Sequence, residues 1–270
     1  SISFLGLRLG IDFNGGSLSE IAFKNARPEQ VMGERSLGPL ALGEVIIQPT
    51  GPTGYSIKTR AVNETERAGI LAALGADATE KSFTSIGPSV GAELVRKSII
   101  SFILVALGII FFIAFSFRKV SKPVSSWKYG LIAIVTLIHD ILIPVGVFAF
   151  LSHTYGTEVD TLFVVAVLTI LGLSVSDTIV VFDRIRENIR VGNFKTFEET
   201  VGNSLKQVYT RSITTSSTVI IVLLALVFFG PTSTKVFAMM LTAGMFLGTY
   251  SSIFLASPLL VLVNKPRAKK

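Results

Sequence analysis

The stretch LGLSVSDTIVVFDRIREN, residues 171–188, places a carboxylate inside a long apolar run. Asp177 comes before the run has ended, because Val180, Val181 and Phe182 still follow it. An ionised side chain is costly to bury, and a chain that keeps one inside an apolar helix commonly uses it. The apolar runs around this stretch therefore decide the fold, and Asp177 is the first candidate functional residue.

The composition is typical of an integral membrane protein. Half of the 270 residues are hydrophobic, 16% are charged, and the mean hydropathy is +0.63. Cysteine is absent, so disulfide bonds are excluded. A helix that crosses a bilayer needs about 20 mostly apolar residues. The sequence predicts an α-helical bundle with five such spans, at residues 99–117, 129–151, 159–182, 212–229 and 236–263.

Lysine and arginine are concentrated in three segments, residues 118–128, 184–211 and 265–270. The loops between them, 152–160 and 230–235, hold a single lysine. The positive-inside rule makes the three basic segments cytoplasmic, including the C-terminal tail. Residues before position 98 carry ten basic and ten acidic side chains, so the net charge of +7 lies in the membrane part. We therefore attribute the basic character to topology and expect no nucleic acid partner.

The region before the first span is then extracytoplasmic. This gives an external domain at residues 10–95 and a transmembrane bundle at 96–264. Residues 1–9 are too short to cross a bilayer and the chain starts without Met, so we expect the end of a truncated first transmembrane helix. The natural protein would then have six spans. A cleaved signal peptide is the alternative.

The external domain has the pattern of a small α/β unit. Asn63 and Glu66 form a capping-box pattern at the start of one helix, which Gly75 ends. Two short helices separate four strand signals, at residues 17–23, 44–48, 55–60 and 79–85. The order β-α-β-β-α-β predicts a ferredoxin-like fold. Residues 10–86 contain no histidine, no cysteine and no phosphate-binding loop, so we expect a binding or structural module without cofactor, metal or catalysis.

Four stretches of the sequence resemble one known family. They are LGIDFNGGS at residues 9–17, IGPSVGAEL at 86–94, SVSDTIVVFDRIREN at 174–188 and GTYSSIFLASPLLV at 248–261. All four are similar to motifs of the SecD and SecF proteins of the RND superfamily, and the third is closer to the SecF version. Ser176 and Thr214 stand where the family commonly has Asn, and both keep a polar side chain.

The resemblance implies a proton-driven subunit of the bacterial Sec protein-export machinery in the cytoplasmic membrane. Its implied partners are SecD, the SecYEG channel with SecA, further YajC and YidC, the translocating preprotein and membrane lipid. Two other functions remain open from the residues themselves: an RND-type exporter of small molecules or lipids, and a scaffold that transports nothing. The sequence does not distinguish H⁺ from Na⁺ as the coupling ion.

Asp177 and Arg211 are candidates for a proton relay. Each lies about 27 Å from the outer end of its predicted span, so the two residues have similar depth on antiparallel helices and could pair. Two alternatives stay open: Arg211 could reach the cytoplasmic interface with its long side chain, and Asp177 could itself be interfacial. Polar neighbours that could support a wet pathway are Ser174, Ser176 and Thr178 on one helix, and Thr214, Thr215 and the three polar residues after them on the next.

Asp140 is a third candidate for the relay. It lies inside the second predicted span, next to His139. Pro144 has no N–H to bond the Asp140 carbonyl, so the helix could kink there. The alternative is a structural hydrogen bond from Asp140 to neighbouring Ser or Thr side chains.

Overall fold

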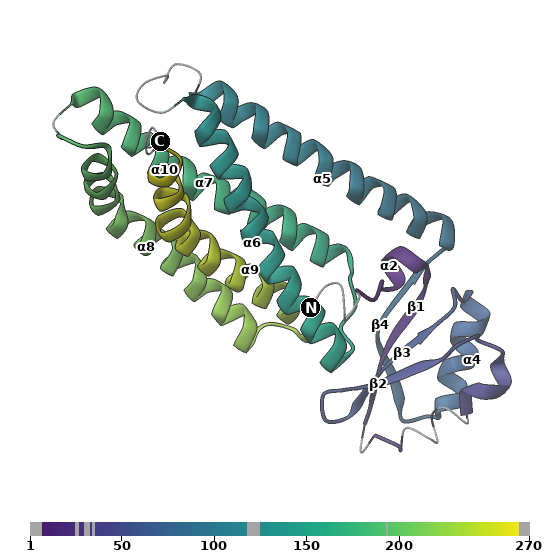
Figure 1. Cartoon of the computed structure of the whole chain (residues 1–270). Helices are drawn as coiled ribbons and strands as arrows, with labels where there is room; N and C mark the ends of the chain where they lie inside the picture. The colour runs from purple at the N-terminus through teal and green to yellow at the C-terminus, as the bar shows by residue number, and fades with distance from the viewer. Residues whose placement is uncertain are drawn as a thin grey trace. The chain divides into compact units, whose positions relative to one another are not determined.

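A computed structural model describes residues 7–24, 27–29, 33, 36–117, 125–192 and 194–264. The chain forms two compact units. The helical unit is built mainly from Ile100–Thr157 and from the chain that follows Asp160 (Figure 1). The α/β unit comprises Arg8–Ile99 together with the short segment Glu158–Asp160. The predicted tail at 265–270, and most of the predicted helix end at 1–9, lie outside the described residues.

The α/β unit contains an antiparallel sheet whose strand order is β2-β3-β1-β4. Its strands are β1 (Gly16–Phe23), β2 (Ile46–Thr50), β3 (Gly54–Thr59) and β4 (Ala78–Ile86), which confirms the four predicted strands. The strand order is that of ferredoxin-like folds. The helix predicted between the first two strands falls largely outside the described residues. Of the residues described there, Gly33, Ser36 and Leu37 are helical and Gly38–Leu40 forms a 3₁₀ turn. The core beneath the sheet is apolar and includes Ile21, Ile57 and Ile70.

The second helix of the α/β unit, α4 (Glu64–Leu74), starts with the predicted capping box. The Asn63 side chain accepts a hydrogen bond from the Glu66 backbone N–H at 2.9 Å. The Glu66 carboxylate accepts one from the Asn63 N–H at 3.0 Å. Both donors would otherwise lack a partner within the helix. Gly75, with φ of +94°, ends the helix in a conformation that suits glycine.

Two of the glycine-bearing stretches, 9–17 and 86–94, pack against each other. The short helix α2 (Ile11–Asn14) lies against the start of α5 (Pro88–Phe117). A Cβ atom at Gly91 would lie 2.7 Å from the Phe13 carbonyl oxygen, so only glycine allows this approach. The close contact accounts for Gly91 and for Gly15, where a Cβ atom would lie 3.0 Å from the Pro88 Cα.

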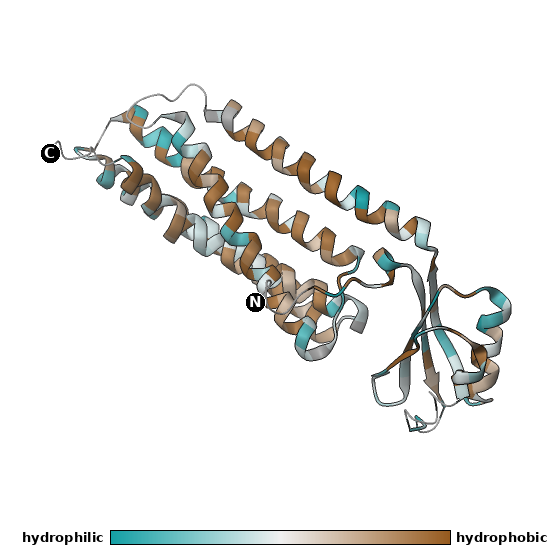
Figure 2. Ribbon diagram, turned by 45° about the vertical axis from the view of Figure 1, so that its right-hand side comes forward, coloured by the Kyte–Doolittle hydropathy of each residue, from teal (hydrophilic) through white to brown (hydrophobic). Residues whose placement is uncertain are grey.

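Among the residues that the structure describes, five helices are long and apolar enough to cross a membrane, as predicted. After α5 they are α6 (Ser126–Tyr155), α7 (Thr161–Val191), α8 (Phe197–Phe229) and a fifth stretch made of α9 (Thr232–Ser251), a π-helix η2 (Ser252–Ala256) and α10 (Ser257–Asn264). Apolar residues cover most of their length (Figure 2). α5 and α8 begin earlier than residues 99 and 212, because polar turns continue the helix beyond the apolar run.

α7 and α9 approach each other closely through two glycines of α9. A Cβ atom at Gly244 would lie 2.3 Å from Ile170 Cγ1, and one at Gly248 would lie 3.3 Å from the Ser174 Cα. Small residues let membrane helices pack backbone to backbone. This contact brings the polar side chains of α7 and α9 within hydrogen-bonding distance.

A candidate site of buried carboxylates

Asp140 of α6 is fully buried and holds three helices together. Ser174 Oγ of α7 donates to Asp140 Oδ2 at 2.5 Å, and Ser251 Oγ of α9 donates to the same oxygen at 2.6 Å. His139 Nδ1 lies 2.9 Å from Asp140 Oδ1. Both carboxylate oxygens therefore have partners.

Asp177 of α7 has a more open environment. Its side chain is half-buried, and Oδ2 accepts a hydrogen bond from Thr249 Oγ1 of α9 at 3.1 Å. Thr249 Oγ1 also lies 2.5 Å from Ser216 Oγ of α8 and 3.0 Å from the Met245 carbonyl oxygen. A hydroxyl has one proton to donate, so Thr249 can bond only one of these acceptors at a time. Asp177, Thr249 and Ser216 thus form a chain in which hydrogen bonds can be exchanged.

A third polar contact lies where α9 ends. Ser252 is the first residue of the π-helix, and its Oγ lies 3.0 Å from Thr178 Oγ1 of α7. Both residues are buried. Single π-turns inside helices are frequent at functional sites. Here the π-turn directly follows Thr249 and Ser251, so the helix is irregular where it supplies hydroxyls to both carboxylates.

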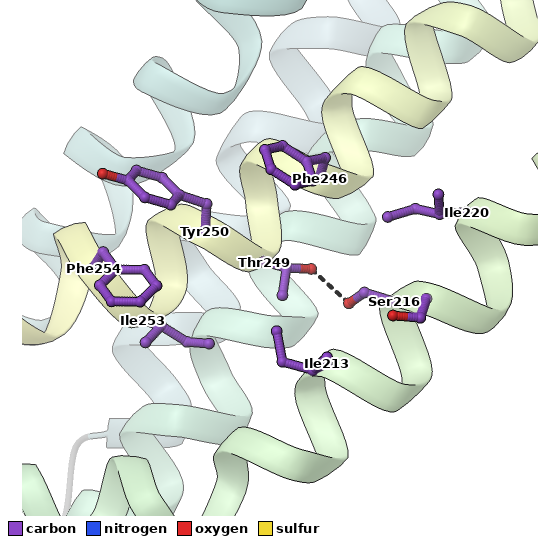
Figure 3. A pocket seen from close by; sticks show the side chains of 9 residues that line it. Ile213, Ser216, Ile220, Phe246, Thr249, Tyr250, Ile253 and Phe254 are labelled. Atoms are coloured by element: carbon purple, nitrogen blue, oxygen red, sulfur yellow. Dashed lines mark hydrogen bonds between the residues drawn. The ribbon is translucent and has the colours of Figure 1, made fainter.

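A cavity of about 280 Å³ borders the Asp177 chain, between α8 and the stretch formed by α9 and η2 (Figure 3). Ser216 and Thr249 face each other there, joined by their hydrogen bond. Most other lining side chains are apolar: Ile213, Ile220, Phe246, Tyr250, Ile253 and Phe254, with Ser217 as a further hydroxyl. The cavity is therefore mostly apolar, and Ser216 and Thr249 are the lining hydroxyls whose hydrogen bonds lead to Asp177.

The predicted pairing of Asp177 with Arg211 does not occur in the structure. No ion pair within 4.0 Å joins these two residues, although both are described. Arg211 is exposed and lines a separate cavity of about 320 Å³ with Asp183, Arg184 and Glu187.

The register of α7 against α8 explains why Asp177 and Arg211 are apart. Asn188 bonds Ser204, and Arg184 bonds Gln207, which places Ser216 rather than Arg211 beside Asp177. Arg211 is five residues, about 7.5 Å, further along α8. The sequence argument counted residues from the outer end of each apolar run and assumed that the two ends lie at the same level. In the structure the two helices are staggered, so equal counts do not place Asp177 and Arg211 side by side.

The remaining predicted residues divide by burial. Ser174 and Thr178 are buried and hydrogen-bonded as described above. Ser176, Thr214 and Thr215 are exposed on the surface of the described helices. The sequence reasoning missed Thr249, Ser251 and Ser252 as site residues. Their signal was a run of hydroxyls, GTYSS at 248–252, in the middle of an apolar span.

A multi-pass helical unit with two carboxylates held by hydroxyls at its centre is typical of a membrane transporter subunit. Residues 67–266 match the family "Protein export membrane protein SecD/SecF, C-terminal", and residues 1–26 match the "SecD/SecF GG Motif". The protein translocase subunit SecF of Thermobaculum terrenum is 46% identical over 95% of this chain and 84% of its own length. SecF of Anaerolinea thermophila is 34% identical over 97% of this chain and 86% of its own length.

Solved structures agree with these relatives. The crystal structure of SecDF from Thermus thermophilus, a translocon-associated membrane protein, matches 98% of this chain with a TM-score of 0.82 and 29% identity. The structure of SecDF in a super-membrane-facing form matches 97% with a TM-score of 0.65 and 30% identity. This chain covers 36% and 35% of those longer chains. The chain belongs to the SecF family of protein translocase subunits, and it is a multi-pass membrane protein.

Proposed function

We propose that this chain works with SecD to convert the transmembrane ion gradient into movement of preproteins across the cytoplasmic membrane. SecYEG and SecA, with YajC and YidC, are the proposed wider partners. Residues 10–95 would be extracytoplasmic and the C-terminus cytoplasmic, as the positions of lysine and arginine favour. The SecF relatives and the SecDF structures support this function over the export of small molecules or lipids.

The placement of Asp177 is the observation that carries the proposal. Asp177 is half-buried within a membrane-spanning helix and bonds a hydroxyl whose own partner borders a cavity. A carboxyl group in this position can bind a proton from one side and release it elsewhere, provided that its partners rearrange. Thr249 and Ser216 supply that rearrangement, because each hydroxyl can either donate or accept.

Asp140 and Arg211 have different proposed roles. Asp140 is enclosed by partners on both oxygens, so it joins α6, α7 and α9 as a structural element and is the less suitable carrier. Arg211 lies about 7.5 Å beyond Ser216 along α8. There it can stabilise negative charge at the end of the path beyond Asp177, while Glu187 and Asp183 compete for it.

The experiment is gradient-dependent translocation into membrane vesicles that contain the full translocase, with SecA-driven initiation held constant. Asp177→Asn keeps the size of the side chain and removes its titration, so the gradient-dependent part of export should be lost. Glu198→Gln is the matched control, because Glu198 is an exposed carboxylate in the first turn of the neighbouring helix α8 and has no part in the proposed path. Gradient-dependent export at the wild-type rate from Asp177→Asn would contradict the proposal.

A further inference from the structure

The segment Glu158–Asp160, between α6 and α7, is part of the α/β unit although the helices beside it are not. The Val159 N–H donates to the Arg8 carbonyl oxygen at 2.7 Å, and the Gly10 N–H donates to the Val159 carbonyl oxygen at 2.8 Å. Leu9 and Val159 therefore form a parallel β-bridge. Val159 is 4% exposed, so the bridge is shielded from solvent.

A salt bridge adds to this backbone contact. Lys58 Nζ lies 2.7 Å from Glu158 Oε1, and the two side chains are only 17% and 21% exposed. Lys58 is on β3, which has β1 on one side and β2 on the other. The segment is thus tied to an inner strand of the sheet as well as to the chain at Leu9.

Gly10 is fitted to the same segment. A Cβ atom at this position would lie 3.0 Å from the Val159 carbonyl oxygen and 3.3 Å from Glu158 Oε2. A Cβ atom would fit only if the Val159 carbonyl gave way by a few tenths of an ångström, and hydrogen bonds at both the N–H and the carbonyl of Val159 oppose that movement. Glycine at position 10 therefore permits the bridge.

We propose that Arg8–Gly10, Lys58 and Glu158–Asp160 form a clasp that transmits movement of α7 to the sheet of the α/β unit. Asp160 is followed directly by Thr161, the first residue of α7, and Asp177 lies about 24 Å further along that helix. A helix is stiff along its axis, and no linker separates it from the clasp. A shift of α7 when Asp177 changes its protonation therefore displaces β3 directly. This inference rests on the proposed function of Asp177.

The clasp remains closed while the protein works, since a salt bridge at Glu158 and two backbone hydrogen bonds at Val159 act on adjacent residues. Its residues position the α/β unit and take no part in proton transfer. Breaking the clasp should uncouple the gradient from export and leave both the SecA-driven part of export and the fold of the helical unit unchanged.

Charge reversal tests the salt bridge in vesicles that contain the full translocase. Lys58→Glu and Glu158→Lys should each lower gradient-dependent export by about fivefold, because each variant places like charges together. The double variant restores an opposite pair and should recover most of the loss, with SecA-driven export unchanged throughout. Lys81→Glu, on an exposed position of β4, is the control for charge alone. Full gradient-dependent export from both single variants would overturn the clasp.

A cross-link tests whether the clasp stays closed. The chain has no native cysteine, so Leu9→Cys with Val159→Cys gives one defined pair at bridged positions. The disulfide should form in the membrane and leave gradient-dependent export intact. Failure to form, or export blocked until reductant is added, would overturn the proposal. Gly10→Ala should uncouple export, whereas Gly38→Ala, where a Cβ meets nothing within 4 Å, should not.

The failures of the two proposals are distinguishable. If Asp177→Asn loses gradient-dependent export while the charge-reversed variants keep it, the clasp is wrong and the role of Asp177 stands. If Asp177→Asn exports like the wild type, the role of Asp177 is wrong, and the movement that the clasp was proposed to transmit is wrong with it.

Discussion

Asp140 and Asp177 lie on neighbouring helices of one bundle, yet their surroundings differ. Asp140 has no solvent exposure, and its oxygens meet two serine hydroxyls and a histidine. Asp177 is half-buried and bonds a threonine that has other possible partners. A carboxylate fixed on both oxygens stabilises a structure, whereas one with exchangeable partners can change state. Under the proposed function, the region around Asp140 contributes stability and the region around Asp177 contributes transport.

Removing the Asp140 carboxylate should have the largest effect on stability. Asp140→Ala leaves the Ser174 hydroxyl buried without its acceptor and leaves the Ser251 hydroxyl only the Gly248 carbonyl oxygen, at a cost of about 3 kcal/mol. Asp177→Ala should cost about 1 kcal/mol, because its single hydroxyl partner has other acceptors. Thermal unfolding of both variants, purified side by side in one detergent, measures the difference. Equal losses would remove the distinction between the two regions.

The two serine partners of Asp140 should act as a coupled pair. Ser174→Ala and Ser251→Ala should each cost about 1–2 kcal/mol, because each removes one donor from the same oxygen. The double variant should cost more than the sum, since Oδ2 then has neither donor. A double-mutant cycle by thermal unfolding measures this coupling, with the exposed Ser176→Ala as control. Strictly additive losses would show that Asp140 does not bind the two helices jointly.

Glu66, a carboxylate of the α/β unit, is the reference for which we expect the smallest effect on stability. Hydrogen bonds from Arg60, and then from the Asn63 backbone, lower the pKa of Glu66 below its ordinary value of 4.5. Its contribution is therefore present above about pH 4.5 and is lost as the pH falls through the lowered pKa.

Glu66→Gln should accordingly lower the unfolding temperature slightly at neutral pH and leave it unchanged in strong acid. Thermal unfolding of the full chain over a pH series would detect this, with the wild type measured in parallel. A difference between the two proteins that persists in strong acid would assign the effect to the capping geometry alone. Glu66 could then not serve as the reference carboxylate for Asp140 and Asp177.

Local patterns were sufficient to predict most of the fold. The five spans depend on length and hydropathy, and the strands and capping box at Asn63 depend on neighbouring residues, so the sequence contains their causes directly. The first span was predicted to start at residue 99, whereas α5 starts at Pro88. The first turns of α5 carry Glu93 and Lys97, so their composition differs from that of a membrane helix.

The site was less predictable, because its contacts join residues far apart in the chain. Asp177 and Asp140 were selected from their cost of burial, which is a local property. Their partners depend on helix register: Thr249 lies 72 residues from Asp177, and Ser251 lies 111 residues from Asp140. The stagger of α7 against α8 likewise separated Asp177 from Arg211. Neither the π-turn nor the inclusion of Glu158–Asp160 in the α/β unit has a local pattern that would predict it.

The glycines at 244 and 248 limit how the bundle can rearrange. With Gly244 against Ile170 and Gly248 against Ser174, α7 and α9 interlock, and sliding one past the other would drive these side chains into backbone. The two helices consequently have few independent degrees of freedom and must travel as one rigid body. α8 meets this pair through the hydrogen bond between Ser216 and Thr249, and such a bond between hydroxyls can be exchanged where a glycine contact cannot.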